Sequence, residues 1–216
     1  MNSLYIGVYG ASGFGKEVMP LVRQQFPELE KHCFVFIDDG AGIEQLNGYL
    51  VHTFDQFVAL QSSAKVVTIA IANSQIREKI AHNLQQANIQ HLDVKAANVL
   101  VLDEVEIAEG SMLCPFVCLT SSIKIGRFFH ANIYSYVAHD CIIGDFVTFA
   151  PGVKCNGNVH IEDHAYIGTG AILKQGTPDQ PLIIGKGAVV GMGAVVTKSV
   201  PAGAVVVGNP ARQLIR

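Results

Sequence analysis

A histidine and an aspartate stand side by side at His139 and Asp140, in the stretch VAHDCIIGD that is otherwise apolar or glycine. Histidine titrates near neutral pH and is the side chain most often used as a general base. A neighbouring carboxylate that accepts the second ring N–H fixes the tautomer and raises the basicity of the ring. The pair therefore predicts a general base with its tuning partner, and a plain surface turn is the alternative.

A glycine-rich loop, GASGFG at residues 10–15, is the second candidate site. It follows the short apolar run SLYIGVYG and precedes the helix-compatible KEVMPLVRQQF. Such a turn lets backbone amides approach a phosphate at the start of a helix. Asp38 and Asp39 end the next apolar run, CFVFI, where a Rossmann-like site places an acid against a ribose or base. The glycine spacing is not a strict GxGxxG, so a tight turn without function is the alternative.

The elements around this loop alternate between strand and helix. A third strand, KVVTIAI, precedes Asn73 or Ser74 as the N-cap of a helix over QIREKIAHNLQQA. Strands that alternate with helices predict parallel βαβ units. The segment is about half the size of a full dinucleotide-binding domain. Residues 1–95 are therefore predicted to form a small Rossmann-like domain.

The second part of the chain follows a six-residue period. Every sixth residue from Val101 to Leu173 is apolar, and the period resumes at Ile184 after the insertion KQGTPDQPLI. Three such repeats complete one 18-residue coil of parallel β-helix, and coils stack at the strand spacing of about 4.8 Å. Cys141 and Cys155 fall on inward positions, where they are expected to fill the core. We expect a β-helix over residues 96–216.

The histidines of the repeats allow a test of a metal site. His130, His139, His160 and His164 occupy four different columns of the 18-residue coil, so they do not stack into one site. His160 and His164 are four residues apart, but that spacing gathers ligands on a helix and not on a β-coil. The sequence therefore predicts no metal.

Composition narrows the class of partner. The chain has 216 residues, 50% of them apolar and 15% charged, with a formal net charge of −3. This charge leaves no electrostatic footprint for nucleic acid or an anionic membrane, and no apolar run approaches the ~20 residues that span a bilayer. The start of the chain does not resemble a signal peptide. Five cysteines without a CxxC pair favour reduced thiols, so a cytoplasmic location is expected.

The repeats resemble the left-handed β-helix of hexapeptide acyltransferases. Together with an N-terminal domain that opens on GASGFGKEV and a chain that closes on GNPAR, they resemble bacterial nucleotide-sugar acetyltransferases. The types are the sialic acid O-acetyltransferases and the UDP- or dTDP-4-amino-sugar N-acetyltransferases. The resemblance implies an α/β plus all-β fold and acetyl-CoA-dependent N-acetylation, at C4, of a nucleotide-linked amino-deoxy sugar. In it, His139 is the catalytic base and Asp140 tunes it.

The resemblance also implies binding residues. The nucleotide pocket would be lined by Ser12, Gly13, Phe14, Asp38, Asp39, Ala72, Asn73 and Gln75, and Asn132 would contact the sugar. Acetyl-CoA would meet Thr148, Gly157, Thr169, Gly191 and Met192. Phe14 and Thr148 stand where relatives have histidine, so the polar contacts there are expected to differ. The insertion is expected to project from a coil corner, where it could wall the acyl-donor tunnel.

Three other functions stay open on sequence alone. A sugar O-acetyltransferase would use the same base, a dinucleotide-dependent oxidoreductase would explain only the glycine loop, and a scaffold would need no catalysis. The assembly is expected to be a C3 homotrimer, because hexapeptide acyltransferases are generally cyclic trimers with active sites between neighbouring prisms. Phe128, Tyr134 and Tyr136 cannot all be interior and could cover such an interface, or pack under the N-terminal domain.

Overall fold

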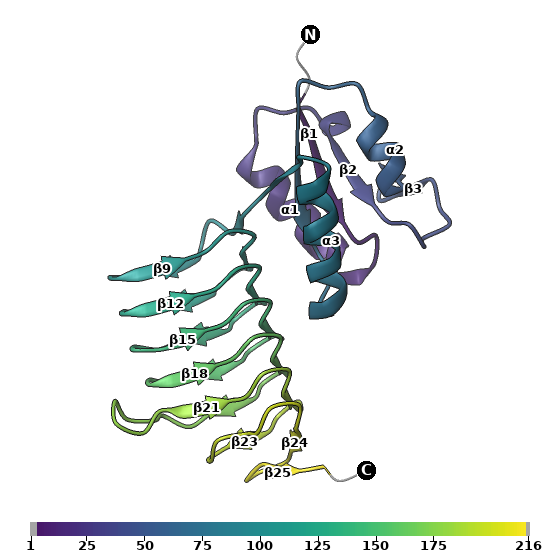
Figure 1. The fold of residues 1–216 in the computed structure, drawn as a ribbon. Helices are drawn as coiled ribbons and strands as arrows, with labels where there is room; N and C mark the ends of the chain where they lie inside the picture. Colours follow the sequence, from purple (N-terminus) through teal and green to yellow (C-terminus); the bar gives the residue numbers. More distant parts are fainter. Residues whose placement is uncertain (1–3, 215–216) are drawn as a thin grey trace. The chain divides into compact units, whose positions relative to one another are not determined.

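The computed structural model describes residues 4–214 and divides into two compact units, Met1–Val94 and Lys95–Arg216 (Figure 1). Each unit has its own core, so each is described by itself. Among the described residues, no helix combines the length and the apolar character needed to cross a bilayer.

The first unit is a six-stranded sheet with three α-helices, in the strand order β3-β4-β2-β1-β5-β6. All neighbouring pairs are parallel except the edge pair of β3 and β4. The strands are β1 (Leu4–Tyr9), β2 (Phe34–Ile37), β3 (Gln45–Leu46), β4 (Tyr49–His52), β5 (Ala64–Ile69) and β6 (Gln90–His91). The helices are α1 (Gly13–Gln25), the 3-10 turn η1 (Lys31–Cys33), α2 (Phe54–Ala59) and α3 (Ser74–Gln86). The order runs outward in both directions from β1, which makes the end of β1 the switch point of a doubly wound sheet.

Position 15, which follows the turn after β1, needs glycine because a side chain there would have no space. A Cβ on Gly15 would lie 1.8 Å from the carbonyl oxygen of Gly10, so helix α1 begins directly against the loop. Helix α1 starts at Gly13, three residues before the predicted start.

The segment from β3 to α2 was not predicted from the sequence. There Thr53 caps α2 and Gln56 donates and accepts the reciprocal bonds of a capping box.

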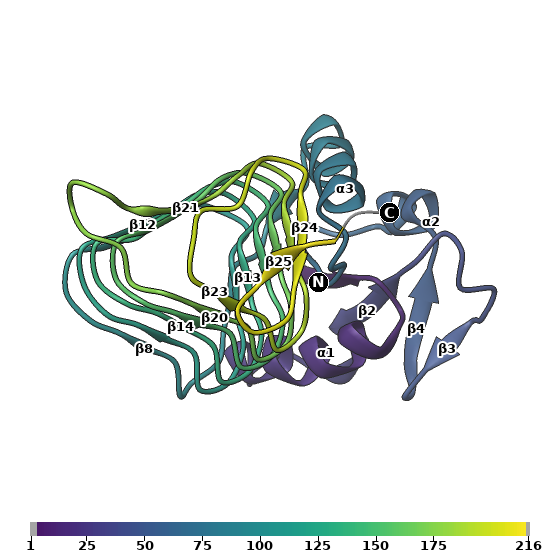
Figure 2. The same cartoon turned by 90° about the horizontal axis from the view of Figure 1, so that it is seen from below.

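The second unit is a left-handed parallel β-helix with three faces. Figure 2 shows its coils superimposed, so that successive turns of the chain follow one three-sided path. Face 1 consists of β7 (Val94–Lys95), β10 (Met112–Leu113), β13 (His130–Ala131), β16 (Thr148–Phe149), β19 (Tyr166–Ile167), β22 (Val189–Val190), β24 (Val205–Val207) and the antiparallel β25 (Arg212–Gln213). Face 2 consists of β8 (Leu100–Val101), β11 (Cys118–Leu119), β14 (Tyr136–Val137), β17 (Lys154–Cys155), β20 (Ile172–Leu173) and β23 (Val195–Val196). Face 3 consists of β9 (Val105–Ile107), β12 (Ile123–Ile125), β15 (Ile142–Ile143), β18 (Val159–Ile161) and β21 (Leu182–Ile184).

The predicted six-residue period corresponds to this geometry. Strands pair with an offset of 18 residues, as between Leu119 and Val137 and between Val137 and Cys155. The predicted inward positions are buried from Leu113 to Leu173, whereas Val101 and Ile107, on the first coil, are half-buried. The predicted fold class, a Rossmann-like unit followed by a left-handed β-helix, is confirmed.

From Glu104 to Gly170, each corner places one residue in the left-handed backbone region. These residues recur every six positions, and the non-glycine ones have φ between 54° and 65°: Glu104, Phe116, Ser122, Phe128, Tyr134, Asp140, Phe146, Asn158 and His164. We call the corner after face 1 corner 1–2, the corner after face 2 corner 2–3, and the corner after face 3 corner 3–1.

Candidate active site

His139 and Asp140 lie at corner 2–3, directly after β14. Nδ1 of His139 is 2.7 Å from Oδ2 of Asp140, and the side chains are 46% and 52% exposed. A carboxylate at this distance accepts the Nδ1–H, which leaves Nε2 as the ring nitrogen that takes a proton. Asp140 has φ 57°, and aspartate tolerates this conformation better than most residues. The geometry is that of a partly exposed general base with an oriented ring.

The coil below supplies the surface on which the ring of His139 lies. A Cβ on Gly157 would be 2.5 Å from both Cε1 and Nε2 of His139, so only glycine leaves the imidazole its place. The backbone of the pair is held from both sides. Asn158 N donates to the carbonyl of His139 at 3.0 Å, and Asp140 N donates to Ser121 O at 3.2 Å. The histidine is therefore fixed by its neighbouring coils.

Four further predicted residues gather at corner 1–2. Asn132 follows β13, Thr169 follows β19, and Gly191 and Met192 follow β22. Gly193 N donates to Thr169 O at 2.8 Å, and the side chain of Met192 is exposed. Corners 1–2 and 2–3 border opposite edges of face 2. One β-helix thus places the histidine pair and Gly157 on one edge and these four residues on the other.

The remaining predicted acetyl-CoA residue, Thr148, lies apart from both groups. It belongs to β16 on face 1, in register with His130 and Tyr166. The structure therefore does not bring all five predicted acetyl-CoA residues together within one chain.

The predicted nucleotide residues gather at one edge of the first unit. Ser12, Gly13 and Phe14 follow β1, Asp38 and Asp39 follow β2, and the stretch from Ala72 to Gln75 follows β5. These three strands are neighbours and parallel, so their carboxyl ends meet at the switch point. Ser12 occupies the N-cap position of α1 but makes no side-chain cap. An uncapped helix start behind a glycine turn is suited to a phosphate.

The two aspartates build this edge. Asp38 accepts from Ala11 N at 2.8 Å and from Gly40 N at 3.0 Å, which ties the glycine loop to the end of β2. Asp39 accepts from the hydroxyl of Tyr9 and from Phe54 N at the start of α2. Burial, followed by the hydrogen bond to Asp39, raises the pKa of the Tyr9 phenol. Both carboxylates therefore shape the edge, whatever else they contact.

Asn73 and Arg77 hold the third loop of this edge. Asn73 caps α3 by accepting from Gln75 N and Ile76 N, both at 3.1 Å. The guanidinium of Arg77 donates from Nη1 to Ile71 O at 2.7 Å and to Ala72 O at 3.1 Å. Arg77 was not predicted from the sequence. Its position in the sequence could have indicated this contact. Arg77 lies one turn after the N-cap Asn73, and helical side chains lean back toward the N-terminus of their helix.

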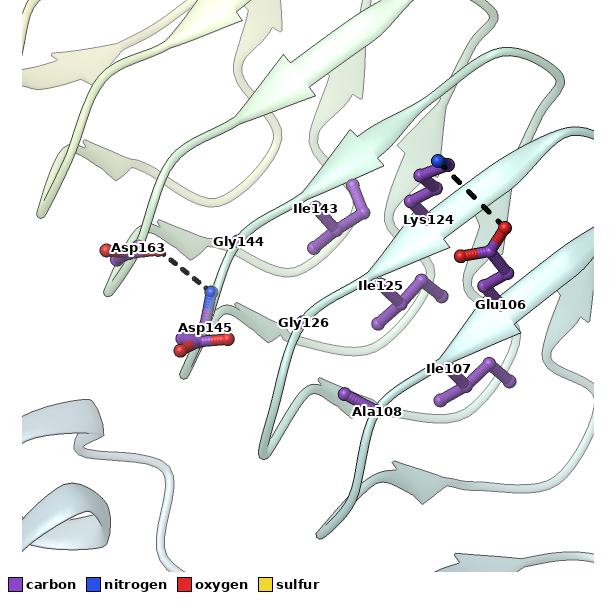
Figure 3. A pocket seen from close by; sticks show the side chains of 10 residues that line it. All are labelled: Glu106, Ile107, Ala108, Lys124, Ile125, Gly126, Ile143, Gly144, Asp145 and Asp163. Atoms are coloured by element: carbon purple, nitrogen blue, oxygen red, sulfur yellow. Dashed lines mark hydrogen bonds and ion pairs between the residues drawn. The ribbon is translucent and has the colours of Figure 1, made fainter.

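A cavity of about 540 Å³ opens at a different corner, 3–1 (Figure 3). Figure 3 shows Asp145 and Asp163 at one end of it and the pair of Glu106 and Lys124 at the other. Asp145 accepts from Arg127 N at 2.7 Å and binds the Arg127 guanidinium, and Asp163 accepts from Asp145 N at 3.0 Å. These carboxylates join successive coils. The cavity lies at another corner from the histidine pair, and no histidine is among the residues that line it.

The four histidines of the repeats lie in separate environments. His130 is on β13, His160 is on β18, and His164 stacks on Phe146 with ring centroids 5.4 Å apart. Within residues 4–214, no group of three or more histidine, cysteine or acidic residues could hold a metal ion.

Comparisons with known proteins agree with both units. Residues 5–84 match the family described as the PglD N-terminal domain. The GDP-perosamine N-acetyltransferase of Escherichia coli O157:H7 is 49% identical over 97% of this chain and 96% of its own length. Among solved structures, WeeI from Acinetobacter baumannii AYE is 71% identical, with a TM-score of 0.97 over 98% of this chain and 100% of WeeI. The acetyltransferase domain of PglB from Neisseria gonorrhoeae FA1090, solved with acetyl coenzyme A, is 28% identical, with a TM-score of 0.85 over 99% of this chain and 100% of that domain. The chain belongs to the nucleotide-sugar acetyltransferases built on hexapeptide repeats, and it is an enzyme.

Proposed function

We propose that this enzyme transfers the acetyl group of acetyl-CoA to the amino group, at C4, of a nucleotide-linked amino-deoxy sugar. The observation that carries the proposal is the 49% identity, over nearly the full length of both chains, to a GDP-perosamine N-acetyltransferase. Acetyl-CoA as the donor is supported by the PglB domain, which was solved with that molecule. Perosamine is itself a 4-amino-4,6-dideoxy sugar, so the predicted position of the amine is in keeping with this relative.

His139 acts as the general base of the reaction. The neutral sugar amine attacks the thioester carbonyl, and Nε2 of His139 takes the proton that the nitrogen loses. Asp140 stabilises the resulting imidazolium through its 2.7 Å contact with Nδ1. The tetrahedral intermediate then expels the CoA thiolate, which receives the proton from His139, and the new bond is the amide. No acyl-enzyme is required.

The edge of the first unit binds the nucleotide. The diphosphate lies at the start of α1, against Ser12, Gly13 and Phe14, where the backbone amides and the helix dipole attract an anion. The loops that Asp38 and Asp39 brace, and the segment from Ala72 to Gln75, line the space for the ribose and base. Phe14 supplies an apolar contact there.

Two copies of the chain build each acetyl-transfer site. Gly157, Thr169, Gly191 and Met192 serve the donor together with Thr148, and Asn132 serves the sugar, but they occupy both edges of face 2 and part of face 1. A C3 homotrimer resolves this separation, because His139 of one copy then faces the donor groove of the next. Closure also leaves no open face for further growth.

A panel of acceptors tests the substrate class. The enzyme is incubated with acetyl-CoA and, in parallel, GDP-perosamine, the UDP- and dTDP-linked 4-amino-4,6-dideoxy sugars, and free and CMP-linked sialic acid. Free CoA is followed with a thiol reagent, and mass spectrometry locates the acetyl group. Turnover with an amino sugar and an amide product is expected. Turnover confined to the sialic acids would replace the proposal by the O-acetyltransferase alternative, and no turnover with any acceptor would reject both.

A further inference from the structure

The largest irregularity of the β-helix within the described residues lies two coils below His139, with the coil of Gly157 and Asn158 in between. Residues 174–181 form a loop between β20 and β21, so Gly157 and Asn158 have no regular coil beneath them. Gly176 N donates to Gly157 O at 2.9 Å, and Leu182 N donates to Asn158 O at 3.0 Å. The surface under the catalytic ring therefore depends on the two ends of a loop.

One side chain ties the three coils together at this point. Asn156 donates from Nδ2 to Leu173 O at 2.7 Å, immediately before the loop begins, and accepts from the hydroxyl of Tyr136 at 2.8 Å. Its backbone carbonyl also accepts from Sγ of Cys141 at 3.2 Å, two residues after His139. Asn156 is thus bound to the coil of the base and to the coil that starts the loop, and Gly157 follows it directly.

From this arrangement we propose that Asn156 is a positioning residue for the proposed base. Asn156 holds the backbone of Gly157 against the imidazole of His139. Gly157 belongs to the coil that has the loop of residues 174–181 below it. The proposal rests on the proposed function, in which His139 takes the proton. A catalytic group must be held to within about 0.5 Å, and misplacement by about 1 Å costs on the order of 100-fold in rate. Because both ends of its amide are bound to protein, Asn156 acts through the ring of His139 and not on the substrate.

Steady-state kinetics of two variants, Asn156→Ala and Tyr136→Phe, test this role. Asn156→Ala is expected to lower kcat by about tenfold or more, with both KM values within about threefold, because the ring loses its position and the substrates keep their contacts. Tyr136→Phe removes one of the two side-chain bonds and is expected to lower kcat by a few fold. It serves as the second variant if Asn156→Ala does not fold.

Asn98→Ala is the matched control. Oδ1 of Asn98 accepts from Phe116 N at 3.3 Å and so also ties two coils, but on the first coil, away from His139. This variant is expected to keep the wild-type kcat. An equal loss of kcat in Asn98→Ala and Asn156→Ala would mean that any tie between coils has this effect, and would overturn the proposal.

A double-mutant cycle shows whether Asn156 acts through the histidine. In a His139→Ala background, adding Asn156→Ala is expected to leave the residual rate within about twofold, since the group to be positioned is gone. If the rate losses of the two single variants multiply in the double variant, Asn156 meets the substrate directly and the proposal is rejected. A wild-type kcat in the single Asn156→Ala variant would also reject the positioning role. If the wild-type enzyme acetylated none of the sugars, the proposed function would fail instead.

The NMR signal of His139 gives a test that needs no turnover. The Cε1–H resonance is assigned by its absence from His139→Ala. Its chemical shift at a fixed pH is expected to move in Asn156→Ala and to stay in Asn98→Ala. An unchanged His139 resonance in Asn156→Ala would contradict the positioning role, whichever substrate the enzyme uses.

Discussion

Asp140 combines two roles in one residue. Each corner from Glu104 to Gly170 has one residue in the left-handed region, and Asp140 fills that position at φ 57°. The same residue presents its carboxylate to Nδ1 of His139 at 2.7 Å. Because the turn sets the backbone of Asp140, its carboxylate is directed at the ring. The contact between His139 and Asp140 is thus a consequence of the corner geometry as much as of the two side chains.

The first prediction separates the charge of Asp140 from its place in the turn. Asp140→Asn keeps the size and tolerates the left-handed backbone, but it removes the negative charge that stabilises the imidazolium. We expect kcat to fall on the order of 100-fold, and His139→Ala to lower it by about 100- to 10,000-fold. CoA release measures both. An Asp140→Asn enzyme within twofold of the wild type would contradict the tuning role.

The second prediction concerns the space above Gly157. Gly157→Ala places a Cβ 2.5 Å from Nε2 of His139, and the half-exposed ring must move aside. We expect a loss of kcat of about tenfold or more and little change in Tm, because the ring moves toward solvent. Gly40→Ala is the control for Tm, since its Cβ would come no nearer than 3.8 Å to Asp38. A fully active Gly157→Ala enzyme would show that the ring tolerates displacement.

Among the elements, the corners of the β-helix are the points where coils come closest. A Cβ on Gly144 would lie 2.7 Å from Asp163 N, and a Cβ on Gly126 would lie 2.7 Å from the carbonyl carbon of Gly144. The small residues that follow the inward positions are therefore needed for stacking. Nearby, Asp145 and Asp163 each accept a backbone N–H from the coil above, which joins the coils at the same corner.

The third prediction tests this stacking. Gly144→Ala sets a methyl group against the backbone of the next coil, which cannot move as a side chain can. We expect a loss of about 1–3 kcal/mol in the free energy of unfolding. Thermal and denaturant unfolding measure it, with Gly40→Ala again as the control. Equal stability of the two variants would mean that the coils separate without cost.

The fourth prediction follows from the pKa of Asp163. Burial acts to raise this pKa, but the Asp145 N–H and the Lys186 ammonium outweigh it, so the pKa is lowered in the folded state. A lowered pKa contributes stability above the unfolded value of about 3.9, and this stability is lost as the pH falls through the folded value. The Tm of the wild type is therefore expected to fall more steeply below about pH 4 than that of Asp163→Asn. The same dependence of Tm on pH in the wild type and in Asp163→Asn would contradict this prediction.

The predictability of each element depended on how local its cause was. The period from Val101 to Leu173 could be recognised because every coil needs apolar residues at the same positions, six residues apart. The segment from β3 to α2 was missed, although Thr53 and Gln56 have the spacing of a capping box. Asn156 was missed for a different reason. Its partners Tyr136 and Leu173 are 20 and 17 residues away, on the coils above and below, and nothing in the motif marks them as neighbours.

For the whole molecule, the two units carry separate parts of the proposed chemistry. The proposed nucleotide-binding edge in the first unit is built by loops at the ends of β1, β2 and β5. The proposed base, His139, lies in the second unit, at corner 2–3 of the β-helix. The roles of the individual binding residues stay predictions. Within the second unit, the predicted donor residues lie on both edges of face 2. This separation is the reason for the proposed trimer.

The last prediction is that the enzyme is a C3 homotrimer whose sites each use two copies. Face 2 and its borders expose Leu100 at 60%, Phe116 at 53% and Tyr134 at 62%, and the rings of Phe116 and Tyr134 stack 4.8 Å apart. A neighbouring prism would cover such an apolar edge. Since one chain has a mass of 23.2 kDa, light scattering is expected to give about 70 kDa, and a fully active species near the mass of one chain would defeat the prediction.

Complementation tests the shared site directly. His139→Ala lacks the base, and Gly191→Trp fills the donor groove, so each variant alone is expected to be inactive. If the two groups meet across an interface, mixed trimers contain sites in which the intact histidine of one copy faces the intact groove of another. Unfolding and refolding the two variants together is then expected to restore part of the activity, whereas mixing without refolding restores none. Sites built within a single chain would stay inactive in every mixture, because each chain carries one of the two defects.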